Sequence, residues 1–180
     1  MIAPEEEKRN LRDSYFMTMC YVIASRSKDE STKHGCVIVT PDNRVMSTGY
    51  NSFPSGINDF IEERQSHKNN EKYYFFEHAE RNAIYSASKY GIPLNNCRLY
   101  VQGTPCADCA RAIIQVGIKE VVIHKKWDLM YKDIWLENKK RSLQMFEEAG
   151  ILLTEWNGKL IDLFAFFRGK KIDIVDGELR

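Results

Sequence analysis

Apolar residues recur at helical spacing in four stretches of the chain. In residues 4–25 they repeat every three or four positions, behind a proline and three acidic residues. This arrangement is typical of an amphipathic helix that packs one face on a sheet. The same spacing predicts helices over residues 78–90, 106–116 and 133–149. A glycine directly follows the first and the last of these three segments, where a helix would end.

Short runs rich in β-branched and aromatic residues predict strands between these helices. The turn formers Pro41, Asp42 and Asn43 separate the first two runs, so we expect an antiparallel hairpin. From residue 98 onward, strands alternate with helices, which favours parallel pairing. The predicted fold class is therefore α/β, a three-layer α/β/α sandwich around a five-stranded mixed sheet. The predicted strands cover residues 34–40, 45–50, 98–102, 120–124 and 151–156.

Two segments do not fit this pattern. Residues 52–77 lack a regular period and are rich in Gly, Pro, Asn and charge. A connection this long is either a functional loop or a solvated insertion, and both interpretations stay open. Residues 160–167 form an apolar run that we take as a helix candidate, to be buried against this or another subunit. We therefore assign residues 1–157 to the main domain and residues 158–180 to a C-terminal extension of it.

Composition narrows the class of protein. A chain of 180 residues with 43% hydrophobic content suffices for one core. Its net charge of +1 disfavours a broad nucleic-acid surface and favours a small-molecule substrate. Five cysteines without framework spacing indicate a reducing compartment. The polar start and the lack of a long apolar segment lead us to expect a cytoplasmic protein without membrane contact.

Two short motifs carry the candidate chemistry. The first is His78-Ala79-Glu80, and the second is Pro105-Cys106-Ala107-Asp108-Cys109. Two thiolates and one imidazole suit zinc, and a set of three protein ligands leaves a tetrahedral position open, as in catalytic zinc sites. Cys106 and Cys109 are three residues apart, so their sulfurs face the same side of a helix start. We expect Thr104 to cap that helix and Pro105 to be its first residue.

Spacing also separates the roles of His78 and Glu80. Residues two apart lie about 200° apart around a helix, so both cannot ligate one ion from a regular helical face. Imidazole is the better third ligand beside two thiolates. We therefore predict His78 as a metal ligand and Glu80 as the general base toward the activated water.

Each motif alone has a plainer explanation. A Cys-x-x-Cys pair is often a structural zinc site or a redox pair, and a closed structural site here would need a fourth ligand such as His124 or Cys97. Both motifs together, in this order and with a strand between them, form the signature of the zinc nucleobase deaminases. We expect one catalytic zinc ion per chain.

The ordered motifs resemble the zinc-dependent cytidine deaminase superfamily and, within it, the deoxycytidylate (dCMP) deaminases. The resemblance implies a cytidine deaminase-like fold over residues 1–157 and hydrolytic deamination of dCMP to dUMP and ammonia in pyrimidine nucleotide metabolism. In that reaction Glu80 shuttles protons and a zinc-bound hydroxide attacks C4. Besides the metal motifs, the matching stretches are residues 26–29 (RSKD), 35–39 (GCVIV), 49–51 (GYN), 109–118 (CARAIIQVGI) and 148–151 (EAGI).

The resemblance also implies substrate contacts. Arg26, Ser27 and Lys28 would bind the 5′-phosphate, for which a guanidinium fork, a hydroxyl and an ammonium are suited. Asn51 would hold the sugar and base, because its amide can donate and accept at once. The plainer alternatives are a solvated charged loop for the first three and a turn residue for Asn51.

Trp127 and Tyr131 follow the fourth predicted strand. Either ring could stack on the flat base, and either could instead belong to the core.

The chain departs from the family pattern in two respects. Ser52 replaces the family's glycine in a loop linked to a nucleoside triphosphate effector, so control by dCTP or dTTP is in doubt. Before His78 the chain offers only His67 for a second zinc. The resemblance implies a homo-oligomer, with a hexamer favoured and the helices after His78 and Cys106 in the interface. The apolar residues of the tail exceed what a small monomer comfortably exposes, so the tail either joins that interface or is buried within its own subunit.

Alternative functions stay open. They are deamination of dCTP, a modified cytosine nucleotide, guanine, a riboflavin intermediate or tRNA adenosine. A non-catalytic zinc module is a further alternative from a different class.

Overall fold

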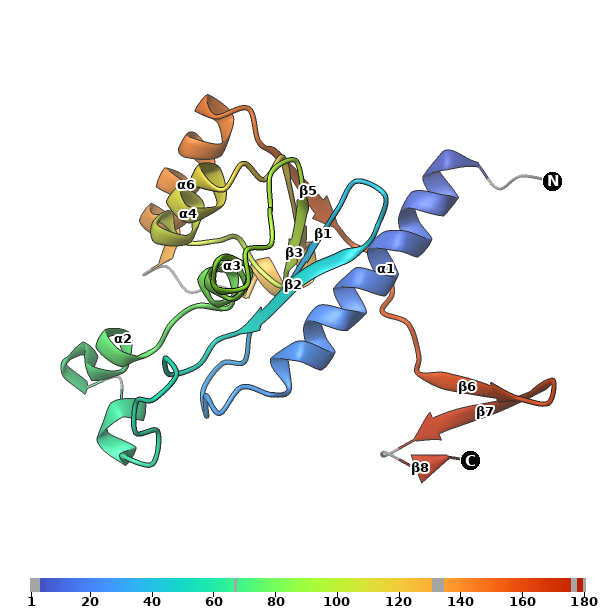
Figure 1. Ribbon diagram of the computed structural model, residues 1–180, viewed down its shortest axis with the longest axis horizontal. Coiled ribbons are helices and arrows are strands. Elements are labelled where there is room, and N and C mark those ends of the chain that lie inside the picture. The colour runs from blue at the N-terminus through green and yellow to red at the C-terminus, as the bar shows by residue number, and fades with distance from the viewer. Residues whose placement is uncertain (1–3, 67, 131–134, 176–177, 180) are drawn as a thin grey trace.

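The computed structural model describes residues 4–66, 68–130, 135–175 and 178–179 (Figure 1). Its elements, in chain order, are α1 (Glu5–Ala24), β1 (Gly35–Val39), β2 (Val45–Tyr50), η1 (Glu62–Gln65), η2 (Lys68–Asn70), α2 (Glu71–Phe75), α3 (Ala79–Lys89), β3 (Arg98–Val101), α4 (Ala107–Gln115), β4 (Glu120–His124), α5 (Lys125–Asp128), α6 (Leu136–Glu148), β5 (Leu152–Trp156), β6 (Phe164–Phe167), β7 (Lys170–Val175) and β8 (Glu178–Leu179).

The central sheet has five strands in the order β2-β1-β3-β4-β5. Strand β1 pairs antiparallel with β2 and with β3, while β3, β4 and β5 run parallel. The parallel half follows from the helices that join those strands, since a parallel pair requires a crossover connection. The predicted mixed sheet is confirmed, and each of its strands lies within a residue or so of its predicted range.

Alternating side chains of the strands feed two separate cores, one on each face of the sheet. Figure 1 shows α1 on one face and α3, α4 and α6 on the other, so the predicted α/β/α sandwich is confirmed. The core under α1 includes Phe16, Met17, Cys20, Val37, Val39, Tyr100, Val122 and Trp156. The core under α3, α4 and α6 includes Ile38, Ala83, Leu99, Val101, Ile113, Ile123 and Phe146.

Two glycines allow helices to lie directly on the strands. A Cβ atom on Gly49 of β2 would lie 2.3 Å from the carbonyl oxygen of Ala79 in α3. A Cβ atom on Gly35 of β1 would lie 2.1 Å from the carbonyl oxygen of Cys20 in α1. Real Cβ atoms do not approach backbone atoms so closely, because the interior is already close-packed. The first turn of α3, which follows His78, is therefore placed by contact with β2.

Residues 52–77 contain short helical turns, η1, η2 and α2, in place of the wholly irregular loop that we predicted. A buried ion pair attaches this segment to the body, because Lys72 Nζ lies 2.7 Å from an oxygen of Asp29. The same carboxylate accepts hydrogen bonds from Asn51 Nδ2 and from the backbone N–H groups of Ser31 and Thr32. Asp29 thus joins residues 29–32, the end of β2 and α2.

The tail is a β-structure, so the helix predicted for residues 160–167 is wrong. Arg168 and Gly169 both have positive φ, 49° and 78°, and form the two-residue turn of a hairpin between β6 and β7. Such turns match the natural twist of paired strands. The apolar run alternates between two faces of the hairpin and does not form a helical stripe. The assignment of residues 158–180 to an extension of the main domain stays a prediction.

All five cysteines have free thiols. Within the described residues, no helix is long and apolar enough to cross a bilayer.

We predict that Gly49→Ala moves α3 away from β2. Overpacking of this kind costs about 1–3 kcal/mol or more, which should lower the thermal unfolding midpoint by at least about 2–4 °C. Because His78 precedes α3, the variant should also lose zinc, measured by atomic absorption. Gly35→Ala is the matched control, since its clash lies with α1 on the opposite face. Equal zinc retention in the two destabilised variants would contradict this assignment.

We predict that Lys72→Met costs about 3–5 kcal/mol of unfolding free energy at pH 7, because it leaves the buried Asp29 carboxylate without a counter-charge. Burial alone would raise the pKa of Asp29, but Lys72 and the hydrogen bonds from Thr32 and Ser31 hold it below its usual value. The stabilisation is therefore complete above the unfolded pKa of about 3.9 and is lost as the pH falls through the native pKa.

Urea unfolding at pH 7 and at a pH well below the unfolded pKa of about 3.9 measures this loss. The control is Lys28→Met, which breaks the more exposed ion pair with Asp59 and should cost less than about 1 kcal/mol. A Lys72→Met loss no larger than that of the control would show that the buried pair does not hold the segment.

Candidate metal centre and active site

Two helix starts meet at the candidate metal centre. His78 directly precedes α3, and Cys106 directly precedes α4, so each is the N-cap residue of its helix. Both helices lie on the same face of the sheet, and both therefore direct their positive ends to one place. Sulfur and carboxylate groups that carry negative charge are favoured at such ends.

The cap of α4 differs from our prediction of Thr104. The Sγ atom of Cys106 accepts a hydrogen bond from the backbone N–H of Cys109, so Cys106 is the cap and Ala107 the first helical residue. Thr104 is instead held by its own N–H, which donates to Oδ1 of Asp128 at 2.8 Å. The helix begins two residues later because Cys106 still has extended backbone angles.

His78, Cys106 and Cys109 place one ligand atom each within 4.8 Å of one another. The Nδ1 atom of His78 lies 3.4 Å from Sγ of Cys106 and 3.6 Å from Sγ of Cys109. Tetrahedral bonds of about 2.3 Å to sulfur and about 2.0–2.1 Å to nitrogen would set sulfur and nitrogen roughly 3.5 Å apart. The three side chains thus fit a zinc ion without rearrangement.

The electrostatics of the two thiols also favour a cation. The hydrogen bond with Cys109 and the contact with His78 lower the pKa of Cys106 to about 4, against the effect of burial. The contact with Cys106 and burial raise the pKa of Cys109 well above its usual value. Two adjacent buried thiolates repel each other, so a second thiolate here requires a positive charge between the sulfurs. A bound divalent metal ion supplies that charge.

Glu80 lies beside this cluster in the first turn of α3 and is buried. Burial raises the pKa of its carboxyl above the usual value. A carboxyl group whose charged and neutral forms are closer in energy is suited to accept and return a proton. The geometry separates Glu80 from the three metal-ligand atoms, as the two-residue spacing from His78 predicts.

A cavity of about 890 Å³ opens onto the cluster. Its size lies in the range of small-molecule sites. Trp127 forms part of its wall and packs edge-to-face on His34 and Tyr21, at centroid distances of 5.5 and 5.8 Å. Tyr73 of α2 meets Trp135 edge-to-face at 5.9 Å, so the segment before α3 contributes to the cavity as well. The wall includes Asn51, His78, Glu80, Thr104, Cys106, Trp127, Asn138 and Lys139.

The predicted substrate residues fall into two groups. Asn51 and Trp127 line the cavity, whereas Arg26, Ser27 and Lys28 are not among its wall residues. Ser27 is buried, and its Oγ donates to the carbonyl oxygen of Asn51 at 2.7 Å. Arg26 is exposed, and Lys28 forms an ion pair with Asp59. Tyr131 and His67 lie outside the described residues.

The amide of Asn51 is engaged on three sides. Its Nδ2 donates to Asp29 and to the carbonyl oxygen of Thr32, and its Oδ1 accepts from the backbone N–H of His34, each at 2.8 Å. Asn51 therefore shapes the loop of residues 29–34, which forms one wall of the cavity.

Sequence reasoning missed several residues of this wall. Burial lowers the pKa of His34 to about 4, so its ring is neutral near pH 7. Asn138 Oδ1 accepts the N–H of Ala107 in the first turn of α4 at 2.6 Å, and Lys139 pairs with Asp128. His34 directly precedes a predicted strand, a position that could have marked it. No signal marked Asn138 or Lys139, because they reach the site from the distant α6.

The closed structural site is not supported. In the part of the chain that the structure describes, the metal-ligand cluster consists of His78, Cys106 and Cys109. His124 is engaged elsewhere, with its Nδ1 2.6 Å from the hydroxyl of Tyr21, and Cys97 packs in the core. Within the described residues the cluster thus has three protein ligands, and two of them, His78 and Cys106, line the cavity.

Comparison with known proteins agrees with this geometry. The family described as "Cytidine and deoxycytidylate deaminase zinc-binding region" matches residues 11–125. The deoxycytidylate deaminase of Mus musculus is 40% identical over 111 residues, which are 60% of this chain and 61% of that protein. The Homo sapiens protein of the same name is 39% identical over the same length. The match thus spans about three fifths of the length of these relatives.

A bacterial relative and a solved structure extend the match. An uncharacterized deaminase of Aliivibrio fischeri is 37% identical over 141 residues, 77% of this chain and 89% of that protein. The dCMP deaminase of cyanophage S-TIM5, in complex with dCMP and dUMP, superposes with a TM-score of 0.63 at 20% identity. That superposition covers 87% of this chain and 100% of the other, and it supports the fold.

The matched region contains both metal motifs, and the His/Cys/Cys cluster supports a zinc cofactor. The chain therefore belongs to the cytidine and deoxycytidylate deaminase zinc-binding family.

Proposed function

We propose that this protein is a zinc-dependent hydrolase that converts dCMP and water to dUMP and ammonia. The observation that carries the proposal is the cluster of His78, Cys106 and Cys109 beside the buried Glu80, on the wall of one cavity. The names of the mammalian relatives and the nucleotides bound to the cyanophage protein support the choice of dCMP. The free cysteines support a reducing, cytoplasmic location.

His78, Cys106 and Cys109 would hold the zinc ion through Nδ1 and the two sulfurs. A zinc ion there would supply Lewis acidity, which makes a water molecule nucleophilic near neutral pH. Because His78 and Cys106 line the cavity, a pyrimidine ring bound there would lie beside the metal ligands.

Glu80 would carry the protons of the reaction. Its carboxylate oxygen takes one proton from the attacking water and delivers it to N3 of the pyrimidine. It then passes the second water proton to the amino group on C4, which leaves as ammonia when the C–N bond breaks. The proton count balances without another acid, because water supplies both protons. Burial of Glu80 excludes bulk water from this transfer.

The cavity wall would hold the nucleotide. Trp127 is fixed by its contacts with Tyr21 and His34 and offers a flat surface for the base. Asn51 would hold the sugar and base at the wall of residues 29–34 through the acceptor capacity that its Oδ1 retains, because both N–H donors of its amide are engaged. The wall is directly preceded by Arg26, Ser27 and Lys28, which we keep as the candidate phosphate contacts. Ser27 would act indirectly, because its Oγ donates a hydrogen bond to the carbonyl oxygen of Asn51. Tyr131 stays a second candidate for stacking.

Assembly and regulation are further parts of this proposal. The family resemblance supports a homo-oligomer, and a hexamer is our preferred state. The side chain of Ser52 accepts a hydrogen bond from Asn82, and its backbone pairs with Glu77. The residue that replaces the family's glycine is thus held in place, which leaves control by a deoxynucleoside triphosphate in doubt.

We predict that Glu80→Gln keeps zinc and fold but lowers kcat for dCMP by about 10²–10⁴-fold, because general acid–base catalysis contributes about that factor. Ammonia release under saturating dCMP measures kcat, and atomic absorption measures zinc. Activity within tenfold of wild type would remove Glu80 from the proton-transfer role.

We predict that Cys106→Ser loses zinc, because a hydroxyl is a much poorer zinc ligand than a thiolate. The matched control is Cys97→Ala, which removes a buried thiol outside the cluster and should keep one zinc ion per chain. Zinc loss in the Cys97 variant would instead favour a closed site with four ligands.

We predict that the 5′-phosphate is required, so that kcat/KM for deoxycytidine is at least about 100-fold lower than for dCMP. Zinc and Glu80 face the pyrimidine, so the preference must come from remote charge-assisted bonds, whose energy is realised as rate. Arg26→Ala should lower kcat/KM for dCMP with zinc unchanged, whereas Arg44→Ala, an exposed arginine of the β1–β2 turn, should not. Equal values for dCMP and deoxycytidine would move the protein toward the nucleoside deaminases.

A further inference from the structure

The C-terminal arm, which we define as residues 158–175 and 178–179, forms a small sheet that stands away from the body (Figure 1). Among the described residues, its strands β6, β7 and β8 pair with one another and with none of the main sheet. Phe164 and Phe166 lie on one face and are 46% and 66% exposed. Leu163 and Ile174, both exposed, accompany Ala165 and Ile172 toward the opposite face.

A sheet this small is marginally stable in water unless a hydrophobic face packs on something else. The arm has apolar side chains on both faces and only a narrow attachment to its own body. Leu160 packs beside the core under α1, and the N–H of Ile161 donates to Oγ1 of Thr18 at 2.9 Å. The arm therefore needs a surface to cover it.

Helix α1 offers such a surface on its outer side. Leu11, Tyr15 and Val22 are 62%, 52% and 49% exposed. At 100° per residue they share one side of the helix, opposite Phe16 and Cys20, which face the sheet. We call these three residues the outer α1 stripe. A shallow groove beside Leu11, lined also by Pro4, Glu6, Glu7, Asn10 and Ser14, extends it toward the start of the helix.

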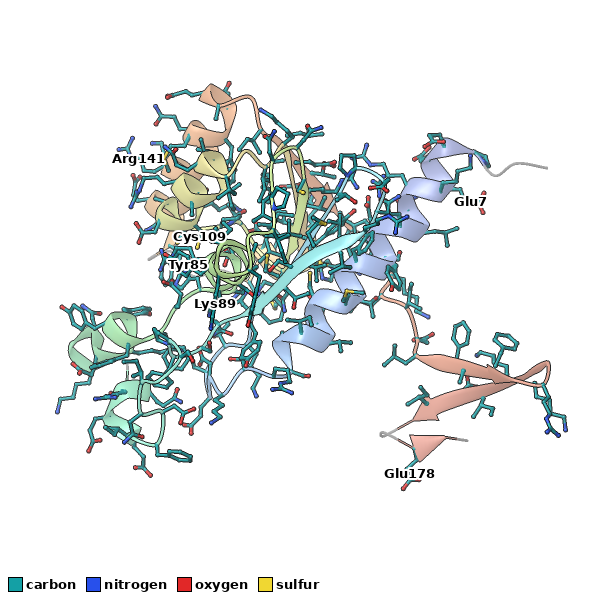
Figure 2. All side chains as sticks on the ribbon, viewed as in Figure 1. Glu7, Tyr85, Lys89, Cys109, Arg141 and Glu178 are labelled. Atoms are coloured by element: carbon teal, nitrogen blue, oxygen red, sulfur yellow. The ribbon has the colours of Figure 1, made fainter. Side chains whose placement is uncertain are left out.

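The two surfaces match in charge. The hairpin turn carries Arg168, and Lys171, which also pairs with Asp173, lies opposite Phe166 on the phenylalanine face; both cations are exposed. The start of α1 carries Glu6 and Glu7, and Glu7 projects from the end of the helix in Figure 2. Opposite charges at matching ends of two apolar surfaces favour one orientation of packing and disfavour the reverse.

The two surfaces also match in length. From Leu11 to Val22 the helix rises about 16 Å, at 1.5 Å per residue. From Leu163 to Arg168 an extended chain covers about 17 Å, at about 3.3 Å per residue. The phenylalanines can therefore lie along the stripe while the basic turn reaches the acidic start of α1.

We propose that the arm of one copy packs on the outer α1 stripe of a second copy. The attachment at Thr18 lies on the same side of α1 as the stripe, between Tyr15 and Val22, and from there the arm leads away from its own helix. To cover the stripe on its own helix, the arm would have to turn back over its attachment at Thr18. A two-fold exchange instead brings each arm beside the root of the other and covers both surfaces at once.

Light scattering of the zinc-loaded full chain at micromolar concentration tests the assembly. We expect a wild-type mass at least twice 21.0 kDa. Phe166→Glu and Leu11→Glu should each lower the mass at least twofold, whereas the control Phe60→Glu, an exposed aromatic of the segment between β2 and η1, should not. Glu7→Lys and Lys171→Glu should each weaken association, and the double variant should restore it.

Cysteine cross-linking separates exchange from folding back. A mixture of Tyr15→Cys and Phe166→Cys chains should form a disulfide between copies under mild oxidation, while wild type does not. Overturning results are a 21.0 kDa wild-type particle, a mass unchanged in both Phe166→Glu and Leu11→Glu, or a disulfide confined to single chains that carry both substitutions. None of these readouts depends on turnover, so they are independent of the proposed deamination.

Discussion

The site depends on two helix starts that must coincide within a fraction of an ångström. His78 and Cys106 are 28 residues apart and belong to different helices, yet Nδ1 and Sγ lie 3.4 Å apart. Metal–ligand bonds tolerate deviations of only about 0.2 Å. Close contact of α3 with Gly49 fixes one start, and the crossover from β3 to β4 fixes the other. The metal centre is therefore a property of the whole sheet and its helices, and not of either motif alone.

The cavity wall depends on a different interaction, the buried carboxylate of Asp29. It gathers Asn51 from the end of β2, Lys72 from α2 and the backbone of the loop between α1 and β1. A buried charge with several partners holds only when all of them are present, because each lost partner leaves a desolvated group unpaired. Helix starts held on a rigid sheet thus supply the metal centre, whereas much of the wall that would select the substrate is built from connected loops.

Local signals in the sequence predicted the sheet, the helices and the metal cluster, because periodicity and ligand spacing act over a few residues. The helix prediction for residues 160–167 failed because a short apolar run fits either structure, and the Arg168–Gly169 turn was given too little weight. Thr104 was predicted as the cap of α4, but its N–H donates to Asp128 of α5, and Cys106 caps the helix instead. The Lys72–Asp29 pair joins residues 43 positions apart, and no local pattern announces such a contact.

The loop before β1 shows how one stretch can combine both kinds of role. Ser27 and Asp29 are buried and bond to Asn51, while Arg26 and Lys28, which alternate with them, are exposed. The bonds of Ser27 and Asp29 to Asn51 build the wall and leave Arg26 and Lys28 directed toward solvent. A phosphate that projected from the cavity past this loop would meet them there without any desolvation of the cations in the free protein. Because Arg26 and Lys28 are exposed and do not line the cavity, they can contact only a phosphate that projects out of the cavity, away from the metal centre.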